Sequence, residues 1–531
     1  MNSVDRNYIW EIKENKINTI NLIITLLVSI ALVSCGGGGG GGGSSSSSAP
    51  SVPASPDPLY VDQWHLKNTG QMGGRAGEDI NVETVSLTRK GSNIRIAVVD
   101  DGMDVAHEDL SANVVAGSHN YLTNGTDPTG GEHGTNVAGI IAARDNTVGV
   151  LGVAPRASLV AYNLLQASGA SNDADAMTRG SPNIHISNNS WGPPDSNGTL
   201  DAPVNSWYTA INTGLSSGRG GRGTIYTWAA GNGAPVDNSN YDGMANYRGV
   251  IAVAAVNDQG EKTSYSEEGA NLLISAPGGG SCNTNTHAIT TTDGTGNTGY
   301  NLTSTGAADY ANRNYTRCMN GTSAATPMVA GVVALMLEAN PTLGWRDVRL
   351  ILAESARKNH PTDVGWSLSS STSPFSFNHK YGFGVVNAVA AVERSSTWTN
   401  VGAELNQTTA LASPAITIPD NNTTGVSNQI TVTGSVISKI EFIQITFTAT
   451  HVFPGELEIT LTSPAGKISQ LSAKRTCASN ACTAYTGWVF SSARHLGESA
   501  NGTWTLIVKD LAAGDIGTFQ SWQLNFFGRA L

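Results

Sequence analysis

The pattern of hydrophobic and polar residues changes near residue 400. Between about residues 57 and 395, short continuous runs of Val, Ile and Ala alternate with longer helical stretches. Continuous runs of this kind are typical of strands that are covered on both faces, as in a parallel α/β sheet. We therefore expect strands at residues 94–100, 157–165, 183–190, 224–231 and 250–256, and buried helices at 133–143 and 322–340.

After about residue 400 the helical pattern ends. Short runs of alternating character follow, separated by turn residues, as in KIEFIQITFTAT (439–450) and TWTLIVKD (503–510). This alternation predicts an all-β sandwich or jelly roll of about 120 residues. A chain of 531 residues is long enough for two or three domains. We place an α/β domain at residues 57–396 and a β-domain at residues 397–531.

The N-terminus has the pattern of an export signal. Residues 19–34 form one apolar run that ends in small residues, and Arg6, Lys13 and Lys16 precede it. The run is short for a membrane span, so we expect a signal peptide at residues 1–34.

The signal ends in LVSC (32–35), which resembles a bacterial lipobox, in which the cysteine carries the lipid. Residues 35–56 would then be a lipidated Cys35 followed by a flexible Gly/Ser/Pro tether. We expect an exported lipoprotein anchored at the outer membrane, the cell surface or in the periplasm. Release of the protein outside the cell is a further alternative. An ordinary signal peptide and an uncleaved anchor are the alternatives.

The remaining cysteines and the net charge restrict the partners. Without Cys35 four cysteines remain, and an even number in an exported protein indicates disulfides. We favour the pairs Cys282–Cys318 and Cys477–Cys482, because each pair lies within one region; a metal site is less favoured, since no CxxC motif accompanies them. The formal charge of −11 argues against nucleic acid as a partner and favours cations and basic peptides.

Three segments carry residues suited to nucleophilic catalysis. Asp100 ends the apolar run VVD, at the strand end where the chemistry of a parallel sheet belongs. His133 begins HGTNVAG, and Ser323 lies in GTSAATP at the start of an apolar helix, where backbone N–H groups can receive negative charge. Together with the flanking GVLGVAPRASLVAYNLL (149–165), these segments resemble the subtilisin-like serine peptidases over roughly residues 57–395.

The resemblance implies a fold and a role for each residue. The fold would be a three-layer α/β domain with a mostly parallel sheet. Ser323 would attack the scissile carbonyl, His133 would transfer the proton, and Asp100 would orient the imidazole. Asn232, in AAGNG (229–233), matches the asparagine that completes the oxyanion hole of the family.

Other segments resemble the kexin and furin branch of the family. They are DPLYVDQWHLKNTGQ (57–71), VVDDGMDVAHEDL (98–110) and SWGPPD (190–195), and NGTWTLIVKDLAAGDIGTFQSWQLNFFG (501–528) is similar to the P domain of those enzymes. The resemblance implies an endopeptidase that cleaves after Arg or Lys, with a dibasic preference as the finer expectation. The alternatives are a broad-specificity subtilisin and a tethered adhesin on a peptidase scaffold.

Acidic residues would set this specificity, because carboxylates on separate loops can bind a guanidinium or ammonium group. By the resemblance, Asp195 and Asp242 fall at the S1 subsite, Asp101 at S2 and Asp201 at S4. The segment of Ser190, Trp191 and Gly192 would offer an edge strand that pairs with extended substrate.

Two positions depart from the pattern of the branch. Gly130 stands where an acid is expected before the histidine, although Glu132 is near. The second S4 acid could be Asp173 or Asp175, and the register does not decide between them. We therefore expect a firm demand for a basic P1 residue and weaker demands at P2 and P4.

The resemblance also implies calcium, which accepts six to eight hard oxygen ligands. ARDNTVGV (143–150) is similar to the calcium loop of the subtilisins. One site would comprise the side chains of Asp57, Asp109 and Asn146 and the carbonyl groups of Arg144, Val148 and Val150. A second site would comprise Asp195, Asp237 and Glu267.

The tether also bears on folding. Residues 36–56 are of low complexity and hold no folded propeptide of the kind that assists subtilisins. We therefore expect either a separate chaperone-like helper or folding without help.

Overall fold

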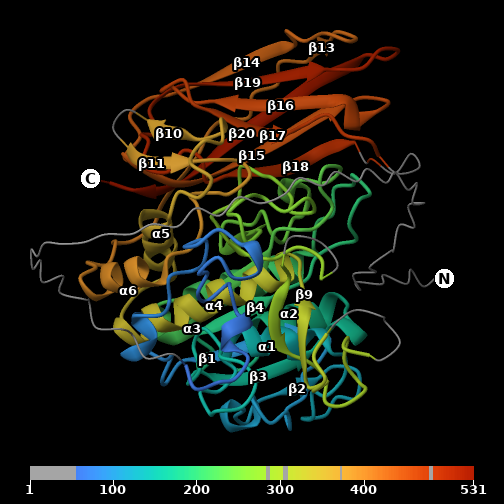
Figure 1. The fold of residues 1–531 in the computed structure, drawn as a ribbon. Helices are drawn as coiled ribbons and strands as arrows, with labels where there is room; N and C mark the ends of the chain where they lie inside the picture. Colours follow the sequence, from blue (N-terminus) through green and yellow to red (C-terminus); the bar gives the residue numbers. More distant parts are fainter. Residues whose placement is uncertain are drawn as a thin grey trace, which may run out of the picture.

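The computed structural model describes residues 55–282, 287–302, 309–370, 373–477, 482 and 484–530. The expected signal peptide, Cys35 and nearly all of the expected tether lie outside these residues. Figure 1 shows the α/β domain below and the β-domain, in orange and red, stacked on it.

The α/β domain is built on a seven-stranded parallel sheet with the order β2-β3-β1-β4-β5-β6-β7. All five expected strands are present. The strands are β1 (Arg95–Asp100), β2 (His119–Asn120), β3 (Ser158–Asn163), β4 (Ile186–Asn189), β5 (Ile225–Ala229), β6 (Val250–Val256) and β7 (Ile274–Pro277). Because β1 pairs with β3 on one side and β4 on the other, Asp100 ends a central strand.

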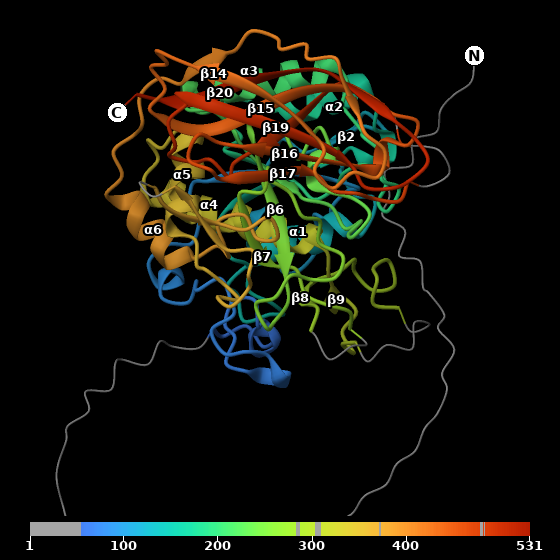
Figure 2. The same ribbon diagram turned by 90° about the horizontal axis from the view of Figure 1, so that it is seen from above.

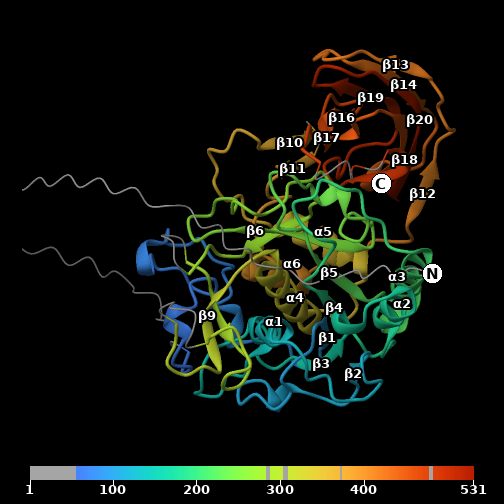
Figure 3. The same ribbon diagram turned by 90° about the vertical axis from the view of Figure 1, so that its right-hand side faces the viewer.

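Helices cover both faces of this sheet, as the layers in Figure 3 show. The side chains of β1 alternate between two cores: Ile96 and Val98 face the first core, and Ala97 and Val99 face the second. Helices α1 (His133–Ala142), α4 (Thr322–Ala339), α5 (Trp345–Ser355) and α6 (Ala388–Ser396) pack on the first, and α2 (Ala170–Thr178) and α3 (Asn205–Gly221) on the second. The three-layer α/β arrangement is thus confirmed.

Helix α4 is the central buried helix. Within the described residues it is the one helix long and apolar enough to cross a membrane, but 89% of that stretch is buried inside the fold. Its apolar composition is therefore explained by its place in the core. Two small hairpins extend the domain, β8 (Ile289–Thr292) with β9 (Tyr315–Met319) and β10 (Ser367–Ser370) with β11 (Ser373–Phe377).

The β-domain is an antiparallel sandwich, as its alternating pattern predicts. One sheet has the order β12-β20-β15-β18, with β13 also on β20, and the other has the order β14-β19-β16-β17. The strands are β12 (Leu405–Thr408), β13 (Ile416–Ile418), β14 (Val426–Val432), β15 (Lys439–Thr450), β16 (Leu457–Thr462), β17 (Ile468–Ser472), β18 (Tyr485–Ser492), β19 (Gly502–Asp510) and β20 (Gly517–Arg529). The alternating sequence pattern follows from burial. In β16, for example, every second residue is buried and those between are half-buried.

The two domains share side chains across their contact. Figure 2, seen from above, shows the β-domain lying over the α/β domain. Tyr241 and Ala270 of the α/β domain belong to the hydrophobic core of the β-domain. Phe442 and Phe527 of the β-domain belong to the main core of the α/β domain. Each domain therefore contributes side chains to the hydrophobic core of the other.

Both expected disulfides are formed. Cys282 bonds to Cys318, and Cys477 bonds to Cys482. The first pair joins two segments of the α/β domain, and the second closes a short loop that follows β17.

Candidate active site

The carboxyl end of β1 holds a charged pair. Asp100 is fully buried, and its Oδ1 accepts a hydrogen bond from Nδ1 of His133 at 2.8 Å. His133 is the first residue of α1, and its side chain is 15% exposed. Because Nδ1 donates to the carboxylate, Nε2 of the neutral imidazole carries the lone pair and can accept a proton.

The neighbouring acids make this imidazole a strong base. Burial alone would lower the pKa of His133, but the Asp100 carboxylate outweighs it, with help from Asp101 and Glu132, and raises the pKa to about 9. Asp101 lies beside the pair. Its carboxylate accepts the N–H groups of Gly134 at 2.9 Å and His133 at 3.3 Å, so it caps the start of α1. Burial and the charge of Asp100 raise the pKa of Asp101 to about 7.

Ser323 is the second residue of α4 and is almost fully buried. Gly321 precedes the helix at φ +100°, a conformation that L side chains rarely adopt. The first N–H groups of α4 have no carbonyl partner within the helix. The Ser323 hydroxyl donates to the carbonyl oxygen of Ser190 at 3.0 Å. In this structure the hydroxyl is thus bonded to the backbone rather than to an imidazole.

Thr322, which was not among the residues predicted from the sequence, fixes Asn232 beside Ser323. Oδ1 of Asn232 accepts the N–H of Thr322 at 2.8 Å and the Thr322 hydroxyl at 2.9 Å. The amide is held through its oxygen, and its Nδ2 group remains a donor. The backbone N–H of Asn232 donates to Asp195 Oδ1 at 3.0 Å, which connects this residue to a neighbouring acidic pocket.

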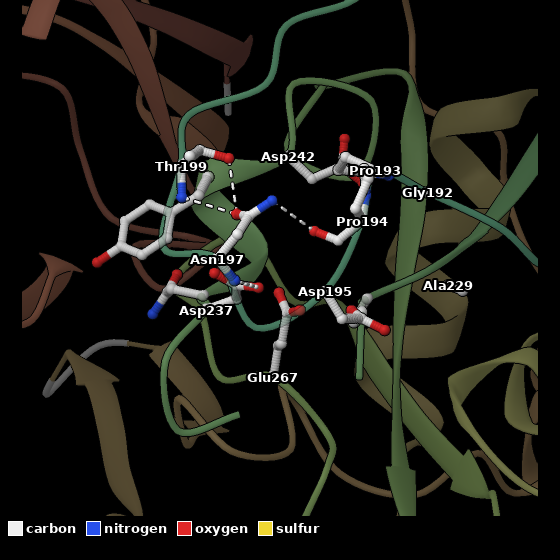
Figure 4. Close-up of a pocket in the computed structure, with 14 residues that line it drawn as sticks. Gly192, Pro193, Pro194, Asp195, Asn197, Thr199, Ala229, Asp237, Asp242 and Glu267 are labelled. Atoms are coloured by element: carbon white, nitrogen blue, oxygen red, sulfur yellow. Dashed lines mark hydrogen bonds between the residues drawn. The ribbon is translucent and has the colours of Figure 1, made fainter. Parts of the chain in front are cut away.

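Four carboxylates line that pocket, which we call the acid pocket and which Figure 4 shows: Asp195, Asp237, Asp242 and Glu267. Carboxylate oxygens of Asp195, Asp237 and Glu267 lie within 4.8 Å of one another. Burial and the charges of Asp237 and Asp195 raise the pKa of Glu267 well above its usual range. Burial and Asp237 likewise raise the pKa of Asp195 to about 7.

Asp242 lies on another wall of the acid pocket. It is 7% exposed, and its Oδ1 accepts the N–H of Met244 at 2.7 Å. Burial, together with the charges of Asp201 and Asp195, raises the pKa of Asp242 to about 7. Asp201 pairs with Asp242 in a short parallel bridge but does not line the pocket.

A second group of carboxylate and amide side chains lies where the start of the domain meets the 144–150 loop. Asp57 Oδ1 accepts the N–H groups of Asn146 at 3.1 Å and Thr147 at 2.8 Å. Asp109 accepts the Asn146 side-chain amide at 3.0 Å and the Val150 N–H at 2.9 Å. The structure thus brings the side chains of Asp57 and Asp109 to Asn146, in the segment that carries Arg144 and Val148.

These clusters share an electrostatic property. Within the described residues, neither the three clustered acids of the pocket nor Asp57 and Asp109 form an ion pair with Lys, Arg or His. Buried or partly buried carboxylates without a direct ion-pair partner fit a hard cation, and oxygen-only ligands suit calcium.

Ser190, Trp191 and Gly192 were expected in an edge strand, but β4 ends at Asn189 and is a central strand of the sheet. Pairing of this segment with substrate stays a prediction. Ser190 and Trp191 are buried, and the Trp191 indole donates to the Val99 carbonyl. The segment is thus a loop that follows a covered strand.

Both candidates for the second S4 acid have local partners, and a role at S4 stays a prediction for either. Asp173 accepts the N–H of Gly169 at the start of α2. Asp175 is bonded to Arg179 and to the Tyr121 hydroxyl. Local partners therefore use both acids, which the sequence register could not show.

Comparison with known proteins agrees with this geometry. The model of the subtilase family matches residues 91–384, and the model of the proprotein convertase P-domain matches residues 440–526. Neuroendocrine convertase 2 of Drosophila melanogaster is 33% identical over 85% of this chain and 69% of its own length. The dibasic-processing endoprotease of Schizosaccharomyces pombe is 33% identical over 89% of this chain and 66% of its own length.

A solved structure is similar over most of this chain. The crystal structure of the Aeromonas sobria serine protease in complex with a chaperone matches with a TM-score of 0.81 and 28% identity, over 90% of this chain and 96% of that chain. This chain therefore belongs to the subtilase family of serine peptidases, and it carries the P domain of the kexin and furin type convertases behind its peptidase domain.

Proposed function

We propose that this peptidase is a calcium-dependent endopeptidase that cleaves after Arg or Lys. The observation that carries the proposal is the acid pocket, because it is connected to Asn232 through the bond to Asp195. A cationic P1 side chain in this pocket would place its carbonyl group next to Asn232 and Ser323. The name of the Schizosaccharomyces pombe relative, a dibasic-processing endoprotease, agrees with basic specificity.

The triad would act in the order of the subtilisin reaction. The Ser323 hydroxyl leaves the Ser190 carbonyl, gives its proton to His133 Nε2 and attacks the scissile carbonyl. Asp100 keeps the proton on Nδ1 and stabilises the imidazolium. His133 then gives the proton to the leaving amine, and water hydrolyses the acyl-enzyme by the same route in reverse.

The oxyanion would be stabilised by fixed donors. We assign the Nδ2 group of Asn232 and the N–H of Ser323 to this role, because Thr322 holds the Asn232 amide by its oxygen and the Ser323 N–H is at the start of α4. Donors that are fixed in advance need no reorganisation when charge develops in the transition state.

The acids would serve separate subsites. Asp195 and Asp242 of the acid pocket would bind the P1 guanidinium or ammonium group. Asp101, beside His133, would face the P2 residue, although in this structure its carboxylate also caps α1. Asp201 stays a prediction for P4.

Calcium would bind in two places. Asp57, Asp109 and Asn146, with carbonyl groups of the 144–150 loop, would hold one ion and tie the N-terminal segment to the domain. Asp195, Asp237 and Glu267 would hold a second ion. A bound cation would offset the repulsion among these carboxylates and leave Asp242 free for the substrate.

Export, lipid attachment at Cys35 and a separate chaperone remain part of the proposal. The two disulfides agree with an exported protein. The similar Aeromonas sobria protease was crystallised with a chaperone, which supports a helper for this chain as well. Expression with and without candidate helper proteins, scored by active enzyme, tests this point.

A P1 profile on a peptide library is the decisive test of specificity. We expect cleavage after Arg and Lys, and we expect Asp242→Asn to reduce kcat/KM for these substrates sharply. The matched control is Asp258→Asn, at a buried aspartate that is bonded to His287 outside the acid pocket. Equal cleavage after apolar and basic residues would favour the broad-specificity alternative, and no labelling of Ser323 by a fluorophosphonate would favour the adhesin.

A further inference from the structure

An arginine of the P domain contacts two segments of the peptidase domain at the acid pocket. Arg475 follows β17 and is 8% exposed. Its Nε donates to the carbonyl oxygen of Gly198, in the peptidase domain, at 2.7 Å. Its Nη1 donates to the Tyr485 hydroxyl at 2.8 Å and the Ser472 hydroxyl at 3.2 Å, both in the P domain. The guanidinium therefore connects the two domains.

Gly198 is held between Arg475 and the acid pocket. While its carbonyl accepts from Arg475, its N–H donates to Asp237 Oδ1 at 2.6 Å. Gly198 has φ +69°, and a Cβ there would lie 2.9 Å from the Thr476 carbonyl of the P domain. The Cys482 sulfur lies 3.3 Å from the Gly198 oxygen and, because it is in a disulfide, has no hydrogen to donate. Gly198 is therefore in close contact with the P domain, with no space for a side chain.

Arg475 also touches a second wall of the pocket. Its guanidinium carbon lies 4.1 Å from the centre of the Tyr241 ring, and Tyr241 lines the acid pocket beside Asp242. The Tyr241 hydroxyl is bonded to Ser472 at 2.9 Å. One P-domain side chain thus contacts the loop that follows Asp195 and the loop that carries Asp242.

The charge of Arg475 has no carboxylate partner in hydrogen-bond contact. Within the part of the chain that the structure describes, its acceptors are a carbonyl and two hydroxyl groups, and no acid lies within ion-pair distance. A buried cation is costly unless nearby negative charge compensates it. Asp237 is the acid that these bonds reach, because its Oδ1 accepts the N–H of Gly198 while the Gly198 carbonyl accepts from Arg475.

We propose that Arg475 is a positioning residue for P1 recognition: from the P domain it fixes Tyr241 of the acid pocket and Gly198, which lies between the pocket-lining residues Asn197 and Thr199, and it offsets the charge of the acids behind them. The ligand assigned to the pocket rests on the proposed function. The hydrogen bond from Arg475 to the Gly198 carbonyl, which we call the clamp, does not depend on that assignment.

Two variants and a matched control test the proposal in the full-length protein. Arg475→Met removes the charge and the hydrogen bonds and keeps much of the volume, and Arg475→Lys keeps the charge. Arg494→Met is the control, because Arg494 is a buried P-domain arginine that bonds across the interface to Ser367 and Leu368, away from the pocket. Active enzyme is counted by fluorophosphonate titration, so that loss of folded protein does not enter the constants.

We expect Arg475→Met to raise KM for a P1-Arg peptide by about tenfold to a hundredfold, with a smaller fall in kcat. Binding of p-aminobenzamidine, a cationic probe of such a pocket, should weaken in parallel, and Arg475→Lys should recover part of it. Hydrogen exchange at the Gly198 amide should become faster. Arg494→Met should change none of these three quantities.

The outcomes separate the clamp from the substrate assignment. Faster exchange at Gly198 in an enzyme without basic preference would uphold the clamp and overturn the proposed function. Unchanged exchange and KM in Arg475→Met would overturn the clamp. If Arg475→Met yields no folded protein, Gly198→Ala approaches the same contact from the other side. It should raise KM for the P1-Arg peptide, and an unchanged KM would count against the proposal.

Discussion

Replacing Asp100 by Asn should separate the electrostatic role of this residue from its role in folding. His133 has a pKa of about 9 against 6.5 for a free imidazole, chiefly because of Asp100. At ~1.36 kcal/mol per pH unit, a shift of this size corresponds to about 3 kcal/mol of net stabilisation of the imidazolium. Because the imidazolium forms in the transition state, losing this stabilisation should lower kcat by about a hundredfold. The Asn side chain also favours the wrong tautomer, which adds to the loss.

The assay is kcat and kcat/KM against pH on one peptide amide, with thermal unfolding of the same samples. In the wild type the rising limb should reflect a base of pKa about 9, and in the variant the limb should move to lower pH. Because the folded-state pKa is raised, the stability that Asp100 provides through His133 is fully present below pH 6.5 and is lost as the pH rises through about 9. The deficit in Tm should therefore be larger at about pH 6 than at about pH 10. A fall in kcat of less than about tenfold, or an equal deficit at both pH values, would refute the reasoning.

Three further predictions concern the surroundings of the triad. Asp101→Asn should erode the preference for a basic P2 residue, and it should move the rising limb of kcat/KM to lower pH, because Asp101 helps to raise the pKa of His133; an unmoved limb would contradict this. Asn232→Ala should lower kcat by about a hundredfold to a thousandfold with little change in KM, and a change confined to KM would remove Asn232 from the oxyanion hole. Calcium at a hundred times its Kd should stabilise the fold by about 2.7 kcal/mol over a chelated sample in calorimetry, and Asp237→Asn should reduce this gain, whereas equal unfolding temperatures with and without chelator would count against both sites.

The elements and the members of the site could be predicted from local patterns. The apolar runs that become β1, β3 and β6 are continuous because both faces of the sheet are covered. Asp100 is recognisable because it ends such a run, and Ser323 because it begins an apolar helix. These features depend on a few neighbouring residues, so one sequence is sufficient to find them.

Contacts between distant segments could not be predicted in this way. Thr322, which fixes Asn232, resembles an ordinary first residue of a helix. Arg475 stands in KRTC, and no local feature connects it to Gly198, which lies 277 positions away. The local partners of Asp173 and Asp175 could not be predicted either, because sequence spacing does not reveal which groups a carboxylate contacts. Which partner a polar group finds is decided by tertiary packing.

The exchange of side chains between the two cores has a consequence for unfolding. Removing the P domain would expose the apolar surfaces that Phe442 and Phe527 cover and would leave Tyr241 without its surroundings. The buried ion pair of Arg346 with Glu441, with two contacts of 2.7 Å, would also be broken. The two domains should therefore melt in a single cooperative transition, and neither should survive as a folded fragment. In this chain the boundary near residue 397 divides the sequence but not the unit that folds.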